Sequence, residues 1–305
     1  YTNTLSIPSN DSTSNPKTVN LSGKGRNYGV YINSVVCNAG VRKVLVTVTD
    51  KDRNTVAGLN AGAFTITENG TTKDIDNLSH PDETKPVSIA LMLDYSGSIT
   101  ADDMDDMEAA SKTFLEGLHW PPAGTDEVAI VKFASAIGYQ YNFDSDLDDL
   151  KDAIDAGYSE DTTNTVIFDS VYSTIDYVFE NAANERRAIV LFSDGEDYSL
   201  TYTLPVVINR ALEKGIPIFT ILSMDAEHPN PGVMQELAEG TGGQYFEAGY
   251  DDLETIYNQI SKALLEDQYI LEYENPSGGS VTLRVSVDDG AGSRGEGSKV
   301  VDGCN

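Results

Sequence analysis

An apolar run that stops at an aspartate constrains this chain more than any other stretch. Residues 87–93 read VSIALML, and Asp94, Ser96 and Ser98 follow, with Gly97 between the two serines. A run of this length bounded by a turn indicates a buried strand of a parallel sheet, and ligands bind at the carboxyl ends of such strands. One carboxylate and two hydroxyls at alternating positions can converge there. Hard oxygen ligands of this kind suit Mg²⁺, Mn²⁺ or Ca²⁺ and not zinc.

The middle of the chain alternates apolar strands with amphipathic helices. This pattern predicts an α/β domain with a doubly wound, mostly parallel sheet. Thr100 is expected to cap the first helix with Asp103 in the capping-box position, and Ser145 to cap a later helix. Residues 137–143, IGYQYNF, are expected to form an antiparallel edge strand, and the last helix to open at Asp251.

Alternating β patterns lie on both sides of this region. Before it, VYINSVV and VRKVLVTVTD alternate apolar and polar residues, and AFTITEN and TKDIDNL flank an Asn-Gly turn in the manner of a hairpin. After it, QYILEYE and VTLRVSV show the same alternation. The simplest account is a smaller all-β, Ig-like sandwich that is split by insertion of the α/β domain. We expect the sandwich at residues 28–85 and 268–305, and the inserted domain at 86–267.

Residues 1–27 are rich in Ser, Thr, Asn and Pro and show no helical period. They are expected to form an extended N-terminal arm. One alternative is a disordered tail. Another is an arm that supports self-assembly by pairing with the sheet edge of a neighbouring subunit. Because the sequence begins at Tyr1 without a methionine or a signal-like segment, a processed or trimmed form is expected.

The chain has two cysteines, Cys37 and Cys304, and no C-x-x-C or Cys/His cluster that would indicate a zinc site. A disulfide between them is expected, because Cys304 lies in a polar tail that offers no core. The alternative is two unrelated buried thiols. The bridge would join the two halves of the sandwich and would fit an oxidising compartment.

The formal net charge of -29 makes nucleic acid and anionic membranes poor partners. No apolar stretch is long enough to span a bilayer, so no membrane insertion is expected.

Three segments are expected at one edge of the predicted sheet, because each follows a buried strand or begins a helix: residues 94–98, Thr165 and Asp194. At this point the chain resembles the von Willebrand factor type A family, over residues 86–267. DYSGS matches the family's D-x-S-x-S motif. NTVIFD resembles the threonine segment of bacterial members, and LFSDGED resembles their aspartate segment. The flanking β strands are similar to the sandwich that often accompanies bacterial members.

The resemblance implies a complete metal-ion-dependent adhesion site. Ser96 and Ser98 would bind the ion directly, and Asp94, Thr165 and Asp194 would bind directly or through water. Mg²⁺ is the expected ion, with Mn²⁺ and Ca²⁺ as alternatives. Neutral hydroxyl ligands leave most of the ion's charge uncompensated, so an Asp or Glu carboxylate of a protein partner can fill an open position. The implied function is metal-dependent adhesion by a secreted or cell-surface protein.

Each of these residues also has an ordinary structural interpretation. Asp94 can cap the loop at a strand end, and Ser96 and Ser98 can form turns. Thr165 can cap a helix, and Asp194 can belong to an Asp-Gly turn. Their joint occurrence in the expected order favours the metal site. Asp169, one helical turn after Thr165, is expected to support the neighbouring loop and not to bind metal.

Two rival functions are an enzyme and a structural subunit of a surface assembly. No G-x-S-x-G, P-loop or H-E-x-x-H signature is present, so an enzyme is not expected. The other rival is a structural subunit of a surface pilus or filament, in which the metal site is secondary. The polar arm and the β sandwich suit that role.

Overall fold

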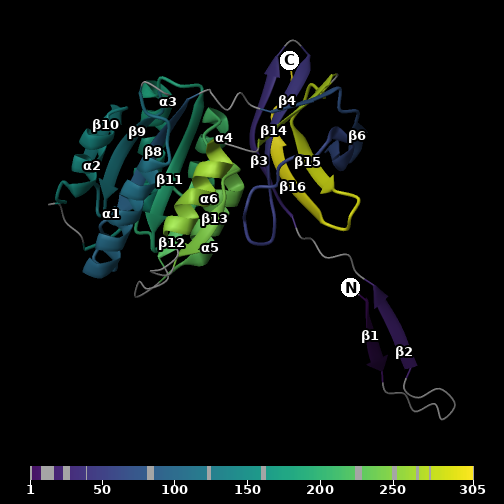
Figure 1. Ribbon diagram of the computed structural model, residues 1–305, viewed down its shortest axis with the longest axis horizontal. Helices are drawn as coiled ribbons and strands as arrows, with labels where there is room; N and C mark the ends of the chain where they lie inside the picture. The colour runs from purple at the N-terminus through teal and green to yellow at the C-terminus, as the bar shows by residue number, and fades with distance from the viewer. Residues whose placement is uncertain are drawn as a thin grey trace.

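The computed structural model has three parts: an N-terminal hairpin, an α/β domain and a pair of antiparallel sheets (Figure 1). The residues that the structure describes are 2–7, 17–22, 28–38, 40–80, 86–121, 125–158, 163–223, 229–248, 253–265, 268–274 and 276–304.

The α/β domain is built on a sheet with the strand order β10-β9-β8-β11-β12-β13. Neighbouring strands pair in parallel except β10, which runs antiparallel to β9 at the edge. This arrangement confirms the predicted mostly parallel sheet and its antiparallel edge strand. The strands are β8 (Val87–Asp94), β9 (Glu127–Phe133), β10 (Ile137–Asp144), β11 (Arg186–Ser193), β12 (Ile218–Ser223) and β13 (Tyr245–Ala248).

Helices cover both faces of this sheet, which confirms the doubly wound fold (Figure 1). On β8, Ile89, Leu91 and Leu93 pack in the core under α1, α2 and α6, whereas Ala90 and Met92 pack in the core under α3, α4 and α5. This is the period-two alternation of a strand that is buried on both faces. The helices are α1 (Ala101–Glu116), α2 (Leu147–Asp155), α3 (Ile167–Asn181), α4 (Leu204–Lys214), α5 (Pro231–Thr241) and α6 (Leu253–Leu265).

The helix starts agree in part with the sequence. Thr100 and Asp103 form the predicted capping box at α1, with hydrogen bonds of 3.2 and 3.1 Å. At α2 the cap is Asp146 and not Ser145, and the Asp146 carboxylate accepts bonds from two first-turn amides at 3.0 and 3.3 Å. A carboxylate at this position also interacts favourably with the helix dipole. The predicted start of the last helix at Asp251 lies outside the described residues.

Two four-stranded sheets form the β sandwich, in the orders β3-β4-β14-β7 and β16-β15-β5-β6. Each combines strands from before and after the α/β domain, which confirms the predicted split sandwich. The domain boundaries at 28–85, 86–267 and 268–305 stay a prediction. The strands are β3 (Gly29–Asn38), β4 (Val41–Thr49), β5 (Phe64–Glu68), β6 (Thr71–Lys73), β7 (Asn77–Ser79), β14 (Gln268–Glu274), β15 (Val281–Asp288) and β16 (Arg294–Val301), and a 3₁₀ turn, η1 (Ala61–Ala63), precedes β5.

The sandwich core needs both halves of the sequence. Val44 and Ile66 from the first half pack in one buried cluster with Tyr269, Leu271 and Leu283 from the second. Strand β14 pairs with β4, and β15 pairs with β5, along most of their lengths. Neither half therefore closes the core by itself, because each sheet would lose an inner strand: β14 and β15 without the second half, or β4 and β5 without the first.

The sandwich contacts the α/β domain closely at the end of α5. Gly242 has φ 91°, and a Cβ atom there would lie 2.3 Å from the Ile32 carbonyl oxygen, so only glycine fits. Asn33 Nδ2 donates to the Gly242 carbonyl at 3.1 Å. Lys299 Nζ donates to the carbonyls of Ile32, Asn33 and Thr241, each at 3.3 Å. Burial lowers the pKa of Lys299 to about 8.

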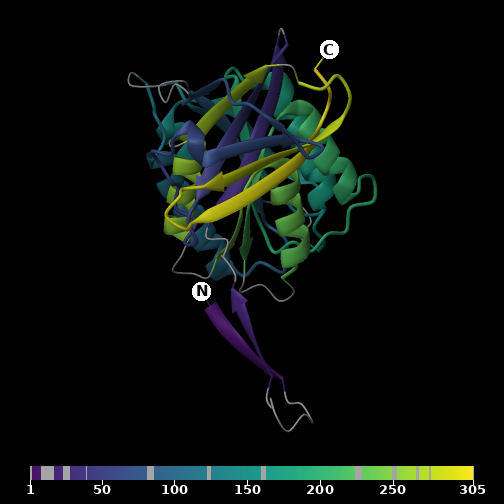
Figure 2. The same cartoon turned by 90° about the vertical axis from the view of Figure 1, so that its right-hand side faces the viewer.

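The N-terminal segment was expected to form an extended arm, and the structure shows two paired strands within it. Strands β1 (Thr2–Ile7) and β2 (Lys17–Ser22) pair antiparallel as a hairpin. The two stretches are separated in sequence by PSNDSTSNP, which is rich in turn-forming residues. Both views show the hairpin standing apart from the sandwich and the α/β domain (Figures 1 and 2).

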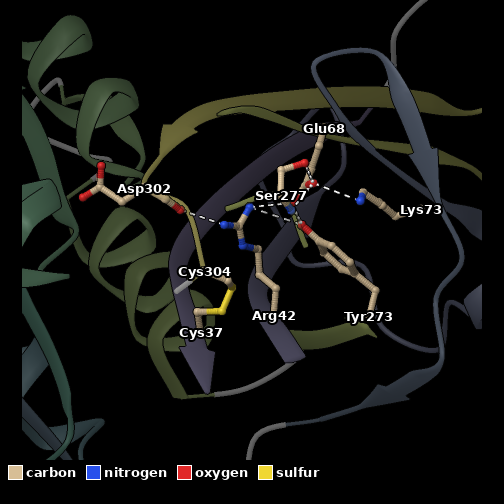
Figure 3. Close-up of a disulfide and its surroundings, with 8 residues drawn as sticks. All are labelled: Cys37, Arg42, Glu68, Lys73, Tyr273, Ser277, Asp302 and Cys304. Atoms are coloured by element: carbon tan, nitrogen blue, oxygen red, sulfur yellow. Dashed lines mark hydrogen bonds and ion pairs between the residues drawn. A yellow bond between two sulfur atoms is a disulfide. The ribbon is translucent and has the colours of Figure 1, made fainter. Parts of the chain in front are cut away.

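The structure contains the predicted disulfide between Cys37 and Cys304, whose Cα atoms lie 5.5 Å apart (Figure 3). Arg42 lies fully buried near this bridge. Its guanidinium donates to Glu68 at 2.6 Å and to the Asp302 carbonyl at 2.7 Å. These bonds tie the C-terminal segment to the sandwich core through a side chain on β4.

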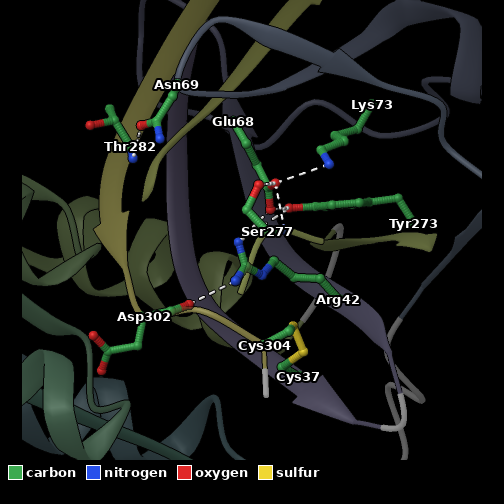
Figure 4. Close-up of polar contacts among 10 residues, drawn as sticks. All are labelled: Cys37, Arg42, Glu68, Asn69, Lys73, Tyr273, Ser277, Thr282, Asp302 and Cys304. Carbon is green, nitrogen blue, oxygen red and sulfur yellow. Dashed lines mark hydrogen bonds and ion pairs between the residues drawn. A yellow bond between two sulfur atoms is a disulfide. The ribbon is translucent and has the colours of Figure 1, made fainter. Parts of the chain in front are cut away.

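Glu68 is the acceptor on which this buried cluster converges (Figure 4). Besides Arg42, it accepts hydrogen bonds from Tyr273 at 2.7 Å and Ser277 at 2.7 Å, and it pairs with Lys73 at 3.1 Å. Burial alone would raise the pKa of Glu68, but the hydrogen bonds to its charged form outweigh burial and lower the pKa to about 2.

The folding stability should therefore depend on pH through Glu68. Its native pKa lies below the ordinary value of 4.5, so the charged group stabilises the fold fully above pH 4.5 and loses that effect as the pH falls toward 2. The shift corresponds to roughly 3 kcal/mol. In Glu68→Gln, urea unfolding at pH 7 should show a loss of this order, since Arg42 is left buried without its charged partner.

A surface pair provides the control. Glu272 on β14 binds Lys43 at 2.6 Å in partly exposed positions, so Glu272→Gln should cost less than about 1 kcal/mol. The difference in unfolding free energy between wild type and Glu68→Gln should shrink between pH 4.5 and 2. A difference that stays constant over this range contradicts the assignment.

Candidate metal centre

The carboxyl edge of the α/β sheet brings the predicted site residues together. Strands β8 and β11 are parallel neighbours, with Leu93 opposite Phe192 in the last register pair. The next residues on the two strands are Asp94 and Ser193, and Asp194 follows. Both aspartates therefore leave the sheet at the same edge, where open α/β sheets bind ligands.

Asp94 is fully buried and uses both carboxylate oxygens. Oδ1 accepts a hydrogen bond from the Ser96 amide at 2.9 Å, and Oδ2 accepts one from the Ser193 hydroxyl at 2.6 Å. The first bond shapes the loop after β8, and the second joins β8 to β11. Ser193 was not among the predicted site residues. Its only signal in the sequence is its place directly before Asp194.

Ser96, Ser98 and Asp194 form a continuous chain of polar contacts. The Ser96 and Ser98 hydroxyl oxygens lie 3.2 Å apart, and the Ser98 hydroxyl donates to Asp194 Oδ2. Asp194 Oδ1 accepts from the Glu196 amide at 2.9 Å. The structure thus brings four predicted residues, Asp94 included, to one place with their oxygens close together.

Thr165 joins this group through its backbone. It is buried directly before α3, and its carbonyl accepts a hydrogen bond from the Tyr198 amide at 2.7 Å. The amide of Val166 donates to the Ala134 carbonyl beyond β9 at 2.9 Å. In the part of the chain described, none of the hydrogen bonds links the Thr165 hydroxyl to the other four side chains.

The two carboxylates carry an unbalanced charge. The pKa of Asp94 is raised to about 7, because burial, together with the nearby Asp194, outweighs the hydrogen bonds that lower it. Burial also raises the pKa of Asp194. Within the described ranges, no Lys, Arg or His forms an ion pair with either group. A bound cation would relieve the repulsion between the carboxylates of Asp94 and Asp194.

The donor set fits a hard divalent cation. It offers two carboxylates and three hydroxyls, all oxygen donors, which suit Mg²⁺, Mn²⁺ or Ca²⁺. No group of three or more His, Cys, Asp or Glu side chains that could hold a metal occurs among the described residues. That finding is compatible with this site, because hydroxyls supply most of its donors.

Asp169 supports the loop that follows Asp194, as the sequence predicted. Its carboxylate accepts hydrogen bonds from the amides of Leu200, Thr201 and Tyr202 at 3.4, 3.2 and 2.9 Å. Asp197 in the same loop accepts from the amide of Phe168 at the start of α3 at 3.1 Å. These bonds hold the segment from Glu196 to Tyr202 against α3.

Comparisons with known proteins support the fold. The profile of the von Willebrand factor type A domain family matches residues 88–259, more than half of the chain. No curated protein gave a match.

Solved structures were also matched, and two of them, with TM-scores of 0.50 and 0.51, share the fold. A von Willebrand factor type A protein from Catenulispora acidiphila is 13% identical, with 90% of this chain and 72% of that chain covered and a TM-score of 0.50. Proximal thread matrix protein 1 from the mussel byssus, solved with a zinc-occupied MIDAS motif, is 18% identical over 65% of this chain and 49% of that chain, with a TM-score of 0.51. The pilus adhesin SpaC from Lactobacillus rhamnosus GG is 10% identical over 99% and 49%, with a TM-score of 0.48. At these identities the likeness concerns the fold alone.

The role of Asp169 can be tested by amide hydrogen exchange. In Asp169→Ala the amides of residues 200–202 lose their charged acceptor and should exchange at least about tenfold faster. Glu180→Ala, at an exposed position near the end of the same helix, should leave these amides unchanged. Equal exchange rates in the two variants would show that Asp169 does not hold the loop.

Proposed function

The chain belongs to the von Willebrand factor type A family, and we propose that it is an adhesion or protein-binding module that binds its partner through a divalent cation. The observation that carries this proposal is the convergence of two buried carboxylates and the Ser96 and Ser98 hydroxyls at one edge of the sheet. Thr165 completes the proposed ligand set.

Each residue has a separate part in the proposed site. Ser96 and Ser98 would hold the ion through their hydroxyls, and Asp94 and Asp194 would balance its charge and orient those hydroxyls. When bound, the ion supplies an open coordination position for an Asp or Glu carboxylate of the protein partner. Mg²⁺ is the proposed ion, and Mn²⁺ and Ca²⁺ are the alternatives, because all three prefer oxygen donors. The mussel protein's zinc shows that a related fold can hold another divalent ion.

We propose binding and not catalysis at this edge of the sheet. A hydrolytic role would need a general base within reach of the metal, which is most often a histidine. Of the described histidines, His80 contacts the Gln268 carbonyl at 2.8 Å and His119 lies 3.3 Å from Asp126. Neither residue belongs to the proposed ligand group.

We further propose that the protein acts outside the cell, secreted or at the cell surface. The Cys37–Cys304 disulfide fits an oxidising compartment. No helix in the described part of the chain has the length and apolar character needed to cross a membrane. The net charge of -29 disfavours nucleic acid as a partner.

Calorimetric titration of the intact chain with Mg²⁺ and Mn²⁺ tests the proposed site. Wild type should bind one ion at a saturable site. Ser98→Ala and Asp194→Asn should each weaken binding at least about tenfold, or about 1.4 kcal/mol. Ser173→Ala, which removes an exposed hydroxyl from α3, should have no effect.

The Ser173→Ala control also distinguishes ion binding at the proposed site from nonspecific ion binding across the acidic surface. A surface with a net charge of -29 attracts cations without any built site. Weak, multiple binding that is equal in all variants would refute the proposed centre.

A second candidate role, a structural subunit of a surface assembly, is favoured by the β1–β2 hairpin. A two-stranded sheet is marginal by itself in water, and this one stands apart from the rest of the protein (Figure 2). Pairing with the sheet edge of another copy would complete it. This is the proposed route of self-assembly, with the metal site secondary.

Removal of residues 1–27 tests that role. If the hairpin mediates self-assembly, the full chain should show concentration-dependent oligomers in sedimentation velocity, and the shortened chain should remain monomeric with unchanged metal affinity. A full chain that stays monomeric at every concentration would argue against this role.

A further inference from the structure

A groove of about 570 Å³ lies beside the candidate metal centre. It is bounded by the turn between β9 and β10, the first turns of α3 and the loop between β11 and α4. Among its lining residues are Ala136, Val166, Ser170, Tyr198 and Leu200. None of the residues of the proposed metal site lines it, so the groove is a separate feature of the same edge.

The groove and the metal centre share a wall. Asn164 and Val166 line the groove, and Thr165 of the proposed site lies between them in the sequence. Tyr198, which also lines the groove, donates its amide to the Thr165 carbonyl at 2.7 Å. A polypeptide bound at the metal centre can therefore extend into the groove.

The loop that forms one side of the groove presents apolar side chains to solvent. Leu200 is 96% exposed and Tyr198 is 49% exposed. A single exposed leucine is ordinary on a protein surface. This leucine differs because its loop is held in place by the Asp169 carboxylate, and because Tyr202, two residues later, stacks on Tyr172 with ring centroids 3.8 Å apart. A loop whose backbone is already held in place loses little conformational entropy when its side chains bind a partner.

A buried polar group lies on α3 among the residues that line the groove. The Ser170 hydroxyl on α3 is shielded from solvent and has no hydrogen-bond partner. Buried hydroxyls without a partner are rare in native structures. A polar group of an entering chain could satisfy it after a small adjustment of the wall.

The charges around the groove indicate the kind of occupant. Asp169 also lines it, but its carboxylate is engaged by loop amides, while Glu196 and Asp197 follow Asp194 on the same loop as Tyr198 and Leu200. An anionic membrane or nucleic acid is disfavoured by this acidic surrounding. A polypeptide fits, provided that its acidic residue reaches the metal and its other residues are neutral or basic.

We propose that this groove is a second contact site for the protein partner, and that it takes an aliphatic or aromatic side chain close in sequence to the carboxylate that approaches the metal. This inference rests on the proposed function for the position of the carboxylate. It adds a specificity element: the partner is recognised by an acidic residue and an apolar residue at a fixed spacing.

A random nine-residue peptide library displayed on phage tests the proposal. Selection on the intact chain in Mg²⁺ should enrich peptides with an acidic residue and, at a constant distance from it, an aliphatic or aromatic residue. Leu200→Ser, a change at a nearly fully exposed position, should reduce the apolar enrichment at least about tenfold. Ser173→Trp, which places a large side chain at the groove wall, should do the same by filling it.

Val300→Ser is the matched control, because Val300 is 63% exposed on β16 of the sandwich. It should leave both preferences intact. An acidic preference without an apolar one, or an apolar preference that survives both groove variants, overturns this inference and leaves the proposed function standing. If the peptides selected on wild type show an apolar preference but no acidic one, the proposed function is overturned. Selection without either preference overturns both.

Discussion

The parallel pairing of β8 with β11 is the contact on which the functional edge depends. It places Asp94 beside Ser193, and the 2.6 Å bond between them closes the edge of the sheet. The Tyr95 amide, which donates to the Phe133 carbonyl at 2.8 Å, secures the same loop to β9. The buried carboxylates, the serine loop and the Thr165 segment take their positions from these strands. Because the strands are buried on both faces, the edge is supported by the two largest cores of the protein.

The insertion of one domain into the other also has a local physical basis. Arg186 at the start of β11 lies opposite Val87, where the chain enters the α/β sheet. The Arg186 guanidinium also contacts the Gln268 side chain at 3.5 Å, where the chain returns to the sandwich. The entry and exit points therefore lie together, as an inserted domain requires. Gln268 Nε2 further donates to the Ala263 carbonyl at 2.7 Å, so the end of α6 is held at this junction.

Most of the fold could be predicted because its strands and helices coincide with strong apolar periodicity and its turns coincide with turn-forming residues. The Thr100 capping box and the alternating strands are local features, and local features survive in the structure. Ser145 failed as a cap because the adjacent Asp146 offers a charged acceptor. The hairpin at the N-terminus was missed because its strands are short and polar. Ser193 and Leu200 could not be found from sequence, since their importance depends on which residues lie across the sheet and which loops are held still.

The Cys37–Cys304 bridge has a mechanical consequence. The two cysteines are 267 positions apart, and everything from Asn38 to Gly303 lies within the covalent loop that they close. A tensile load applied to the chain on either side of this loop passes across the sulfur–sulfur bond. The α/β domain, the edge that would bind a partner and most of the sandwich are then bypassed by the force. Force that enters through a partner bound at that edge is different, because it enters inside the covalent loop and reaches the chain outside it through the folded α/β domain and the sandwich.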